Sequence, residues 1–419
     1  MSYEVRNGSE ELELKVYNVD EEGINNNKNN DNVYGDNEND KLLLDNRRNK
    51  KKERLYWVDA LRIFASYLVV LIHCSYLDHK ESKEVFSAEW AGFYFFYCVL
   101  KPCVPLFMMI SGLLFLDPNR TVSLSSLYKK SIPRLLKGYF FWSVYYTIVD
   151  RLIVNLNHNS FSFDWSNISK LMMNVVTGKD GNHLWYIQFC LGLYMYAPVY
   201  REMIPNKTLS WYTACISCIC YHFIPTVIEF VQTFISPLND MASTAKSFLG
   251  SLRLYPFTGC ITYFMFGYLL NANTFTEKKY IYPFYILGIF GFIITPILMF
   301  SSCHVAGKET RKFGDYMNFN VCIYSIGIFM FFKYTVNDYL QKLIKMKSIK
   351  KVITVLSDCS FGIYLLHYHV YHVLIKINFH PQIIKVPLLF APFYAFVVFS
   401  ISFICIYMMR KIRLLKQFT

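Results

Sequence analysis

The chain has 419 residues, of which 54% are hydrophobic and only 17% are charged, whereas roughly 25% of the residues of a soluble domain are charged. So few charged side chains leave too little polar surface for a water-soluble enzyme, and that class is excluded. The 43 Lys and Arg residues outnumber the 30 Asp and Glu residues. The composition predicts a multi-pass membrane protein built as an all-α helical bundle.

The first 46 residues are polar, and five of the six residues at positions 25–30 are Asn. Such a segment cannot bury enough apolar surface to offset its chain entropy, so we predict a disordered cytoplasmic tail over residues 1–46. The tail lacks the apolar stretch of a cleavable signal peptide. A basic juxtamembrane cluster follows at residues 47–54. The membrane domain is expected over residues 55–410, and a basic cytoplasmic C-terminus over residues 411–419.

Ten apolar stretches follow the tail, and each is close to the roughly 20 residues that a transmembrane helix needs. Pro102 and Pro105 interrupt the second stretch, which we therefore expect to be kinked. The expected spans are residues 55–77, 90–116, 135–155, 183–203, 209–229, 254–272, 280–300, 316–334, 352–376 and 386–409.

The distribution of Lys and Arg predicts the orientation of these spans. With a cytoplasmic N-terminus, the inner segment 335–351 carries five Lys residues, whereas the outer loop 78–89 mixes acidic and basic side chains. Both termini are therefore expected in the cytoplasm. The plasma membrane is the expected location, with an internal membrane as the alternative. Because the excess positive charge is a topology signal, no nucleic-acid partner is expected, and membrane lipid is the expected environment.

Eleven of the twelve Cys residues lie in apolar stretches, and we place only Cys303 in a loop. Disulfide frameworks need paired Cys residues in exposed segments, which this pattern does not offer. Cys215, Cys218 and Cys220 lie in one unbroken apolar stretch and are interpreted as small buried hydrophobic residues. No metal site is predicted.

The first span contains Asp59, Arg62 and His73. Ionisable residues inside a membrane are costly, so each needs a partner or a function. The eleven residues from Arg62 to His73 make three helical turns plus roughly 20°, so both side chains share one face, about 16 Å apart along the axis. This face offers a fixed positive charge near the cytoplasm and an imidazole deeper in the span. The residues alone leave a second interpretation open, in which Arg62 pairs with Asp59 and His73 only hydrogen-bonds within the bundle.

Short motifs continue in order along the chain. The first is D-x-x-R followed by ten residues and a His, at Asp59, Arg62 and His73. The others are P-L-F-x-x-x-S-G at residues 105–112, the basic pair Arg134 and Lys137, H-L-W-Y at residues 183–186 and S-F-G-I-Y-L-L-H at residues 360–367. Over residues 55–410 this order resembles the acyltransferase 3 family of integral-membrane acyltransferases. The chain departs from the family's R-x-x-R motif, because Lys137 replaces the second Arg.

The resemblance implies transfer of an acyl group from acyl-CoA, with acetyl-CoA as the expected donor, to a hydroxyl group of a sugar or related acceptor, without a metal. Arg62, Arg134 and Lys137 are then expected to bind the phosphates of the donor, for which fixed positive charge is suited. His73 is expected to act as general base on the acceptor hydroxyl, and Asp59 is expected to serve catalysis by orienting Arg62. Substrate contacts are expected from Ser111, His183, Trp185 and His367.

Two functions of other classes account for parts of the pattern. A transporter or channel would also place His and Arg inside a bundle, but duplicated halves are common in transporters, and we find no internal repeat. A non-catalytic scaffold would leave the alignment of Arg62 with His73 unexplained. The leading hypothesis is therefore an integral-membrane acyltransferase, with a transporter or channel as the alternative.

Overall fold

The computed structural model describes residues 54–81, 85–120, 124–158, 165–177, 183–254, 259–273, 275, 277–379 and 386–419. The predicted tail and all but the last residue of the basic cluster lie outside the described residues. Within the described ranges every regular element is helical and no strand occurs. The predicted all-α fold is confirmed.

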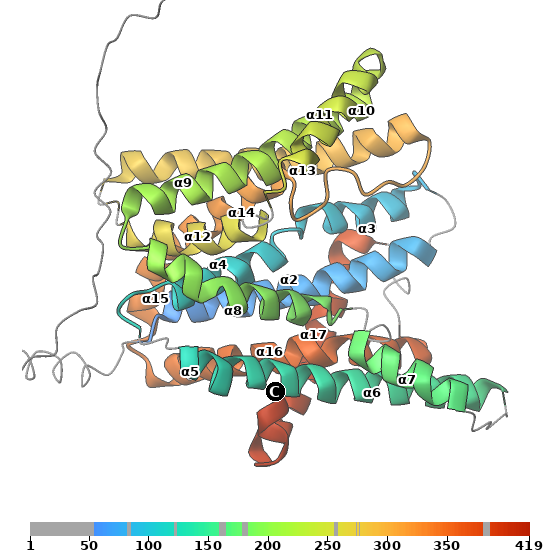
Figure 1. Cartoon of the computed structure of the whole chain (residues 1–419). Coiled ribbons are helices and arrows are strands. Elements are labelled where there is room, and N and C mark those ends of the chain that lie inside the picture. Colours follow the sequence, from blue (N-terminus) through green and yellow to red (C-terminus); the bar gives the residue numbers. More distant parts are fainter. Residues whose placement is uncertain are drawn as a thin grey trace, which may run out of the picture. The chain divides into compact units, whose positions relative to one another are not determined.

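The helices lie side by side in the unit that begins at Leu55 (Figure 1). The long single helices are α2 (Tyr56–Glu81), α6 (Ile132–His158), α8 (Trp185–Met203), α12 (Gly259–Ala272), α13 (Lys278–Ala306), α16 (Lys347–Lys376) and α17 (Pro387–Lys411). Three further pairs are consecutive along the chain: α3 (Ala88–Val99) with α4 (Cys103–Phe115), α9 (Lys207–Cys218) with α10 (Ile224–Phe234), and α14 (Phe319–Phe331) with α15 (Asn337–Leu343). The short helices are α5 (Leu124–Ser126), α7 (Trp165–Thr177) and α11 (Asn239–Ser251).

Each predicted span coincides with one helix or one consecutive pair. Among the described residues, six helical segments are long and apolar enough to cross a membrane. They are Tyr56–Ser75, Ala88–Phe115, Lys207–Phe234, Lys278–Ala306, Phe319–Leu343 and Pro387–Lys411. The stretches over α6, α8, α12 and α16 remain predictions as spans. The chain is a multi-pass membrane protein, and its count of ten spans stays an expectation.

Helix α13 illustrates the surface that lipid would cover. Ile286, Ile289 and Phe290 are each more than half exposed, as is Ile297, two to three turns further along the helix. Exposed apolar side chains at this density are unfavourable in water and favourable in a bilayer. The exposed face of α13 therefore indicates a lipid environment.

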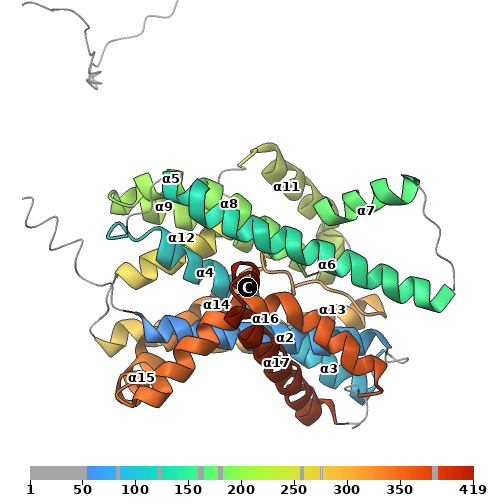
Figure 2. The same cartoon turned by 90° about the horizontal axis from the view of Figure 1, so that it is seen from below.

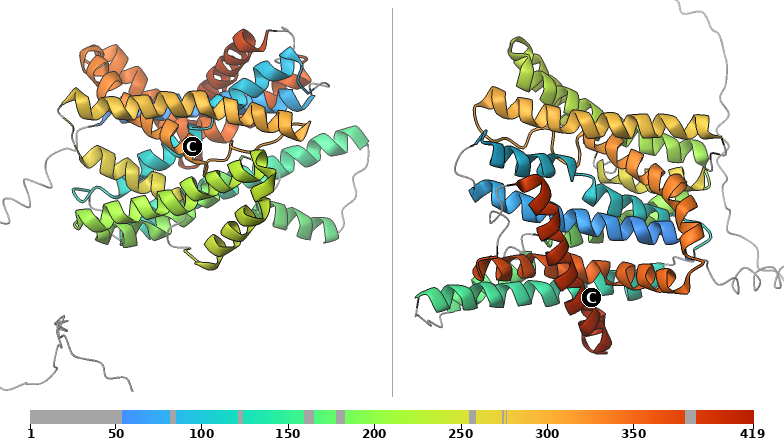
Figure 3. Two further views of the ribbon diagram at one scale, coloured as in Figure 1. Left: turned by 90° about the horizontal axis from the view of Figure 1, so that it is seen from above. Right: turned by 180° about the vertical axis from the view of Figure 1, so that it is seen from behind.

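Helix α2 is central to the packing. It contacts α3, α4, α16 and α17, and the view from behind in Figure 3 shows it, in blue, between the α3–α4 pair and α16. Arg62 of α2 meets Ser357 of α16, and eleven residues later His73 meets His367. Because residue numbers rise together along both helices, α2 and α16 are parallel. The ten-span topology also requires this, since they are its first and ninth spans.

Helix α17 packs on α2 and α16, and the residues that follow it contact α6 (Figure 2). A Cβ atom built on Gly362 of α16 would lie 2.6 Å from Ile406 of α17, so the two helices are in close contact there. After α17, Phe418 stacks on Phe141 of α6 with ring centroids 4.4 Å apart. The Trp142 indole also donates a hydrogen bond to the Phe418 carbonyl at 3.0 Å. These contacts hold the end of α17 against both α16 and α6.

The predicted kink in the second span is confirmed. Helix α3 ends at Val99, and α4 begins at Cys103, after Pro102. Lys101 lies in the break, and only 4% of its surface is exposed. Its Nζ atom lies 3.4 Å from the centroid of the Tyr97 ring. The break therefore carries a buried cation that is stabilised by an aromatic face.

Helices α4 and α12 touch backbone to backbone, at Gly112 and Gly267. A Cβ atom on Gly112 would lie 1.8 Å from the Phe264 carbonyl oxygen, and one on Gly267 would lie 2.0 Å from that of Met109. No side chain fits at either position. Glycine permits this close approach, as small residues commonly do between membrane helices.

We expect Gly112→Ala to lower the free energy of unfolding by about 1–3 kcal/mol, because the methyl group of Ala would overlap the α12 backbone. Gly192 of α8 is the matched control, since a Cβ atom there would meet no atom of the described residues within 4 Å. Melting temperatures of the detergent-solubilised variants test this. An unchanged melting temperature for Gly112→Ala would contradict the observed packing of α4 on α12.

All twelve Cys residues lie among the described residues, and none of them forms a disulfide bond. The placement of Cys303 in a loop is wrong: it lies in α13, is fully buried, and its thiol is 3.3 Å from the Tyr94 hydroxyl oxygen. The apolar stretch continues past the predicted end of the span at residue 300, which explains the error. Cys215 is exposed on α9, not buried as expected, because apolar residues of a membrane protein also face outward.

Topology is open to direct measurement. We expect reporters fused after Lys207 and after Lys351 to be cytoplasmic, and a reporter near Asn167 to be external, since Lys-rich segments remain inside. The sequon Asn167-Ile168-Ser169 offers a second probe, because an external Asn167 accepts a glycan in the endoplasmic reticulum. An external reporter after Lys351 would contradict the second half of the topology.

Candidate active site

A cavity of 560 Å³ lies among α2, α4, α6, α8, α16 and α17. Apolar side chains of α4 line it, including Phe107, Ile110 and Leu114. Six residues that the sequence singled out line it together: Arg62, His73, Ser111, Arg134, His183 and Trp185. The fold therefore gathers side chains from three separate predicted spans and from the first turn of a fourth helix, α6, around one space.

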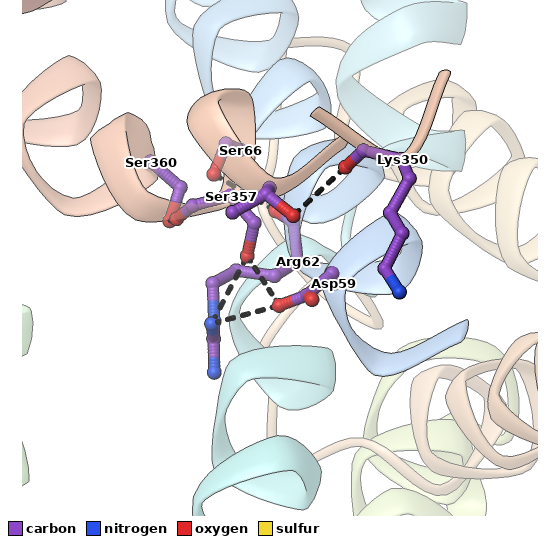
Figure 4. A network of polar contacts seen from close by, with 7 residues as sticks. Asp59, Arg62, Ser66, Lys350, Ser357 and Ser360 are labelled. Carbon is purple, nitrogen blue, oxygen red and sulfur yellow. Dashed lines mark hydrogen bonds and ion pairs between the residues drawn. The ribbon is translucent and has the colours of Figure 1, made fainter. Parts of the chain in front are cut away.

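Arg62 is held at one end of the cavity by a polar network, shown in Figure 4. Its Nη1 atom lies 3.1 Å from the Ser357 hydroxyl and 3.5 Å from Asp59 Oδ1. Ser357 in turn donates to Asp59 Oδ1 at 2.7 Å. Asp59 is only 4% exposed, and its carboxylate contacts both of these side chains. The network fixes the guanidinium group at the edge of the cavity.

Two more Arg residues lie near this end. Arg134 belongs to the first turn of α6 and lines the cavity. Arg410, near the end of α17, also lines the cavity. One of its N–H groups donates to the Thr419 carbonyl at 3.2 Å. Three guanidinium groups thus border one end of the space.

The opposite end contains three His residues. His73 lines the cavity, and its ring centroid lies 5.2 Å from that of His367 and 6.4 Å from that of His183. His183 is buried and hydrogen-bonds to the Leu365 carbonyl through Nε2 at 3.2 Å. Tyr364 donates to the His183 carbonyl, so α16 anchors both the backbone and the side chain of His183.

Aromatic side chains border the cavity next to the His residues. Trp185 stacks on Tyr316, with ring centroids 5.7 Å apart and planes inclined by 23°. Trp185 is 41% exposed, so one part of its ring is open to an incoming molecule. Tyr186 and Tyr364 also line the space.

The comparison with protein families identifies the class of protein to which this chain belongs. A family description, the acyltransferase domain of the acyltransferase 3 family, matches residues 55–407. The chain belongs to the acyltransferase 3 family. It is therefore a membrane acyltransferase, and the resemblance drawn from its motifs is confirmed. No curated protein and no solved structure gives a significant match.

The acyltransferase 3 motifs are distributed unevenly around the cavity. Arg134, the first residue of the basic pair, lines it, whereas Lys137 is exposed and does not. His367, in the last motif, is 1% exposed and lies behind His73 without lining the cavity. Asp59 contacts Arg62 and lies fourteen residues, or about 21 Å, from His73 along α2. The structure thus groups Asp59 with the cationic end and His367 with the imidazole end.

Sequence reasoning missed Arg410 and Ser357 as parts of this acyltransferase site. Arg410 directly follows the predicted span 386–409 and precedes Lys411, and basic residues at such a position commonly mark only the cytoplasmic side. Ser357 belongs to no recognised motif. A signal did exist for Ser357, since it lies three residues before the S-F-G-I-Y-L-L-H motif on the same helix.

No group of three or more His, Cys, Asp or Glu side chains in the described parts of the chain is arranged to hold a metal ion. This includes the cluster of His73, His183 and His367.

Proposed function

We propose that this acyltransferase moves an acyl group, with acetyl as the first expectation, from acyl-CoA to a hydroxyl group of a sugar or related acceptor. One observation carries the proposal: a single cavity joins a cationic end to an imidazole end. We further propose a plasma-membrane location with both termini cytoplasmic, so that the cationic end faces the compartment that contains acyl-CoA.

The cationic end suits the phosphates of CoA. Arg62, Arg134 and Arg410 present planar guanidinium groups that keep their charge at any physiological pH and bind phosphate oxygens in pairs. Asp59 supports this role by orienting Arg62 through the shared contact with Ser357. We expect Lys137 to contribute less, because it is exposed outside the cavity lining.

The length and lining of the cavity support the same donor. Arg62 and His73 are about 16 Å apart along α2, a separation that the extended pantetheine arm of CoA can bridge. The side chains between them are largely apolar, including Val69 and Ile72 of α2 itself. A donor whose phosphates bind Arg62 therefore places its thioester near His73.

His73 is the proposed general base. An imidazole beside the thioester takes the proton of the acceptor hydroxyl as its oxygen attacks the acyl carbonyl. The carbon–sulfur bond then breaks, and the thiolate of CoA recovers the proton. Because the hydroxyl attacks directly, this route needs no acyl-enzyme intermediate.

The aromatic end is the proposed acceptor subsite. The exposed face of Trp185, fixed by its stack on Tyr316, provides a flat apolar surface for a sugar ring, as aromatic side chains do in ligand sites. His183 and Ser111 also line the cavity, where they can make polar contacts with the sugar. A sugar bound there presents its hydroxyl groups to His73.

The test is acyl transfer by purified protein. We would incubate it with radiolabelled acetyl-CoA and fractionated cell-envelope glycans, and measure which fraction gains alkali-labile label. Label in a glycan fraction, absent with the His73→Ala variant, is the expected result. Release of CoA with label only in protein or lipid would contradict the sugar acceptor and retain the acyltransferase.

A further inference from the structure

Two imidazole nitrogens beside His73 are buried and have no hydrogen-bond partner among the residues that the structure describes: Nδ1 of His183 and Nε2 of His367. Both residues are 1% exposed. A buried polar atom left unpaired costs free energy, so two of them at one place require an explanation. Neither takes part in the proton transfer described above, in which His73 alone accepts the proton.

The other nitrogen of each ring identifies the tautomer. A carbonyl oxygen can only accept a hydrogen bond. His367 Nδ1 lies 2.6 Å from the Tyr364 carbonyl oxygen and 3.3 Å from that of Ile363, so Nδ1 carries the proton and donates. Nε2 of a neutral His367 is then unprotonated, and it can only accept a hydrogen bond.

His73 is the donor best placed to meet it. The His183 ring is equally close to His367, at 5.2 Å, but its Nε2 donates to the Leu365 carbonyl, so Nδ1 of a neutral His183 has no proton to donate. The ring centroids of His73 and His367 are 5.2 Å apart, a separation at which two imidazoles can bring nitrogens within hydrogen-bond distance. The His183 ring is farther from His73, at 6.4 Å, and lies nearly parallel to the Tyr368 ring, at 5.1 Å. His367 is also the more firmly oriented, because it bonds to the preceding turn of its own helix.

We infer that His367 is a positioning residue, whose Nε2 accepts a hydrogen bond from a ring N–H of His73. The bond fixes the tautomer and plane of His73, so that its second nitrogen is bare and faces the cavity. This inference rests on the proposed function. When the acceptor proton moves to that bare nitrogen, the positive charge on His73 is stabilised through the bond to His367, as a second residue commonly orients a catalytic base.

The experiment is a double-mutant cycle on single-turnover acyl transfer, with folded amount and CoA binding measured in the same preparations. His367→Phe removes the lone pair at similar size, and we expect about a tenfold lower transfer rate with an unchanged Kd for CoA. His367→Gln places a carbonyl oxygen near the position of Nε2 and is expected to recover most of the rate. His369→Phe is the matched control, because His369 lies on the same helix against Tyr145, outside the cavity lining.

The cycle distinguishes positioning from packing. In a His73→Ala background, His367→Phe is expected to cause no further loss, because a residue that acts through His73 has nothing left to act on. Independent, multiplying losses would overturn the inference, as would a wild-type rate for His367→Phe. The inference would also be overturned if the rate losses of His73→Ala and His183→Phe were non-additive while those of His73→Ala and His367→Phe were additive. A wild-type transfer rate for His73→Ala would contradict the proposed base itself. A loss with His73→Ala but none with His367→Phe would contradict only the role of His367.

Discussion

His73→Ala is expected to lower the rate constant for acyl transfer by roughly 10²–10⁴-fold, the usual contribution of a general base. The affinity for CoA should hardly change, because the phosphates bind three helical turns away at Arg62. Single-turnover transfer and equilibrium CoA binding, measured on the same purified variant, separate these two effects. The expected signature is a lower kcat with an unchanged dissociation constant.

His369→Ala serves as the control for removing an imidazole from the bundle, since its ring contacts Tyr145 and not the cavity. It should transfer at the wild-type rate. If His73→Ala transfers as fast as His369→Ala, His73 is only a packed polar residue. The base is then another residue of the cavity lining, with His183 as the next candidate.

The fold class followed from local features of the sequence. Apolar stretches of span length, with Pro102 beside a short break, are properties of consecutive residues, and the helices formed where these stretches lie. The alignment of Arg62 with His73 was predictable for the same reason, since both belong to one helix of known pitch. The helices α6, α8 and α16 carry more polar or charged side chains than the six spans, whereas α12 is apolar but has only 14 residues.

The composition of the cavity was less accessible to sequence reasoning. Arg410 and Ser357 belong to the site only because α17 and α16 pack against the first helix, and no spacing along the chain encodes that. Lys137 shows the reverse: it fits a family motif three residues after Arg134, yet the turn of α6 leaves it outside the cavity lining. Motifs identified which segments converge, whereas tertiary packing decides which residue of each segment faces the cavity.

Arg62→Ala is expected to weaken CoA binding by roughly 10- to 160-fold, the equivalent of about 1.5–3 kcal/mol for a hydrogen bond to a charged group. Arg62→Lys should recover only part of this affinity, because an ammonium group cannot reproduce the paired contacts of the guanidinium fork. Arg134→Ala and Arg410→Ala should resemble Arg62→Ala in kind, whereas Lys137→Ala should be milder.

The matched control for charge is Lys129→Ala, since Lys129 is exposed and outside the cavity lining. Titration of each variant with CoA and with dephospho-CoA, which lacks the 3′-phosphate, shows which phosphate each Arg contacts. A variant that has lost its partner should bind the two ligands with a smaller difference in affinity than the wild type does. If Arg62→Ala binds CoA as tightly as Lys129→Ala, the guanidinium group only neutralises Asp59, and the donor phosphates bind elsewhere.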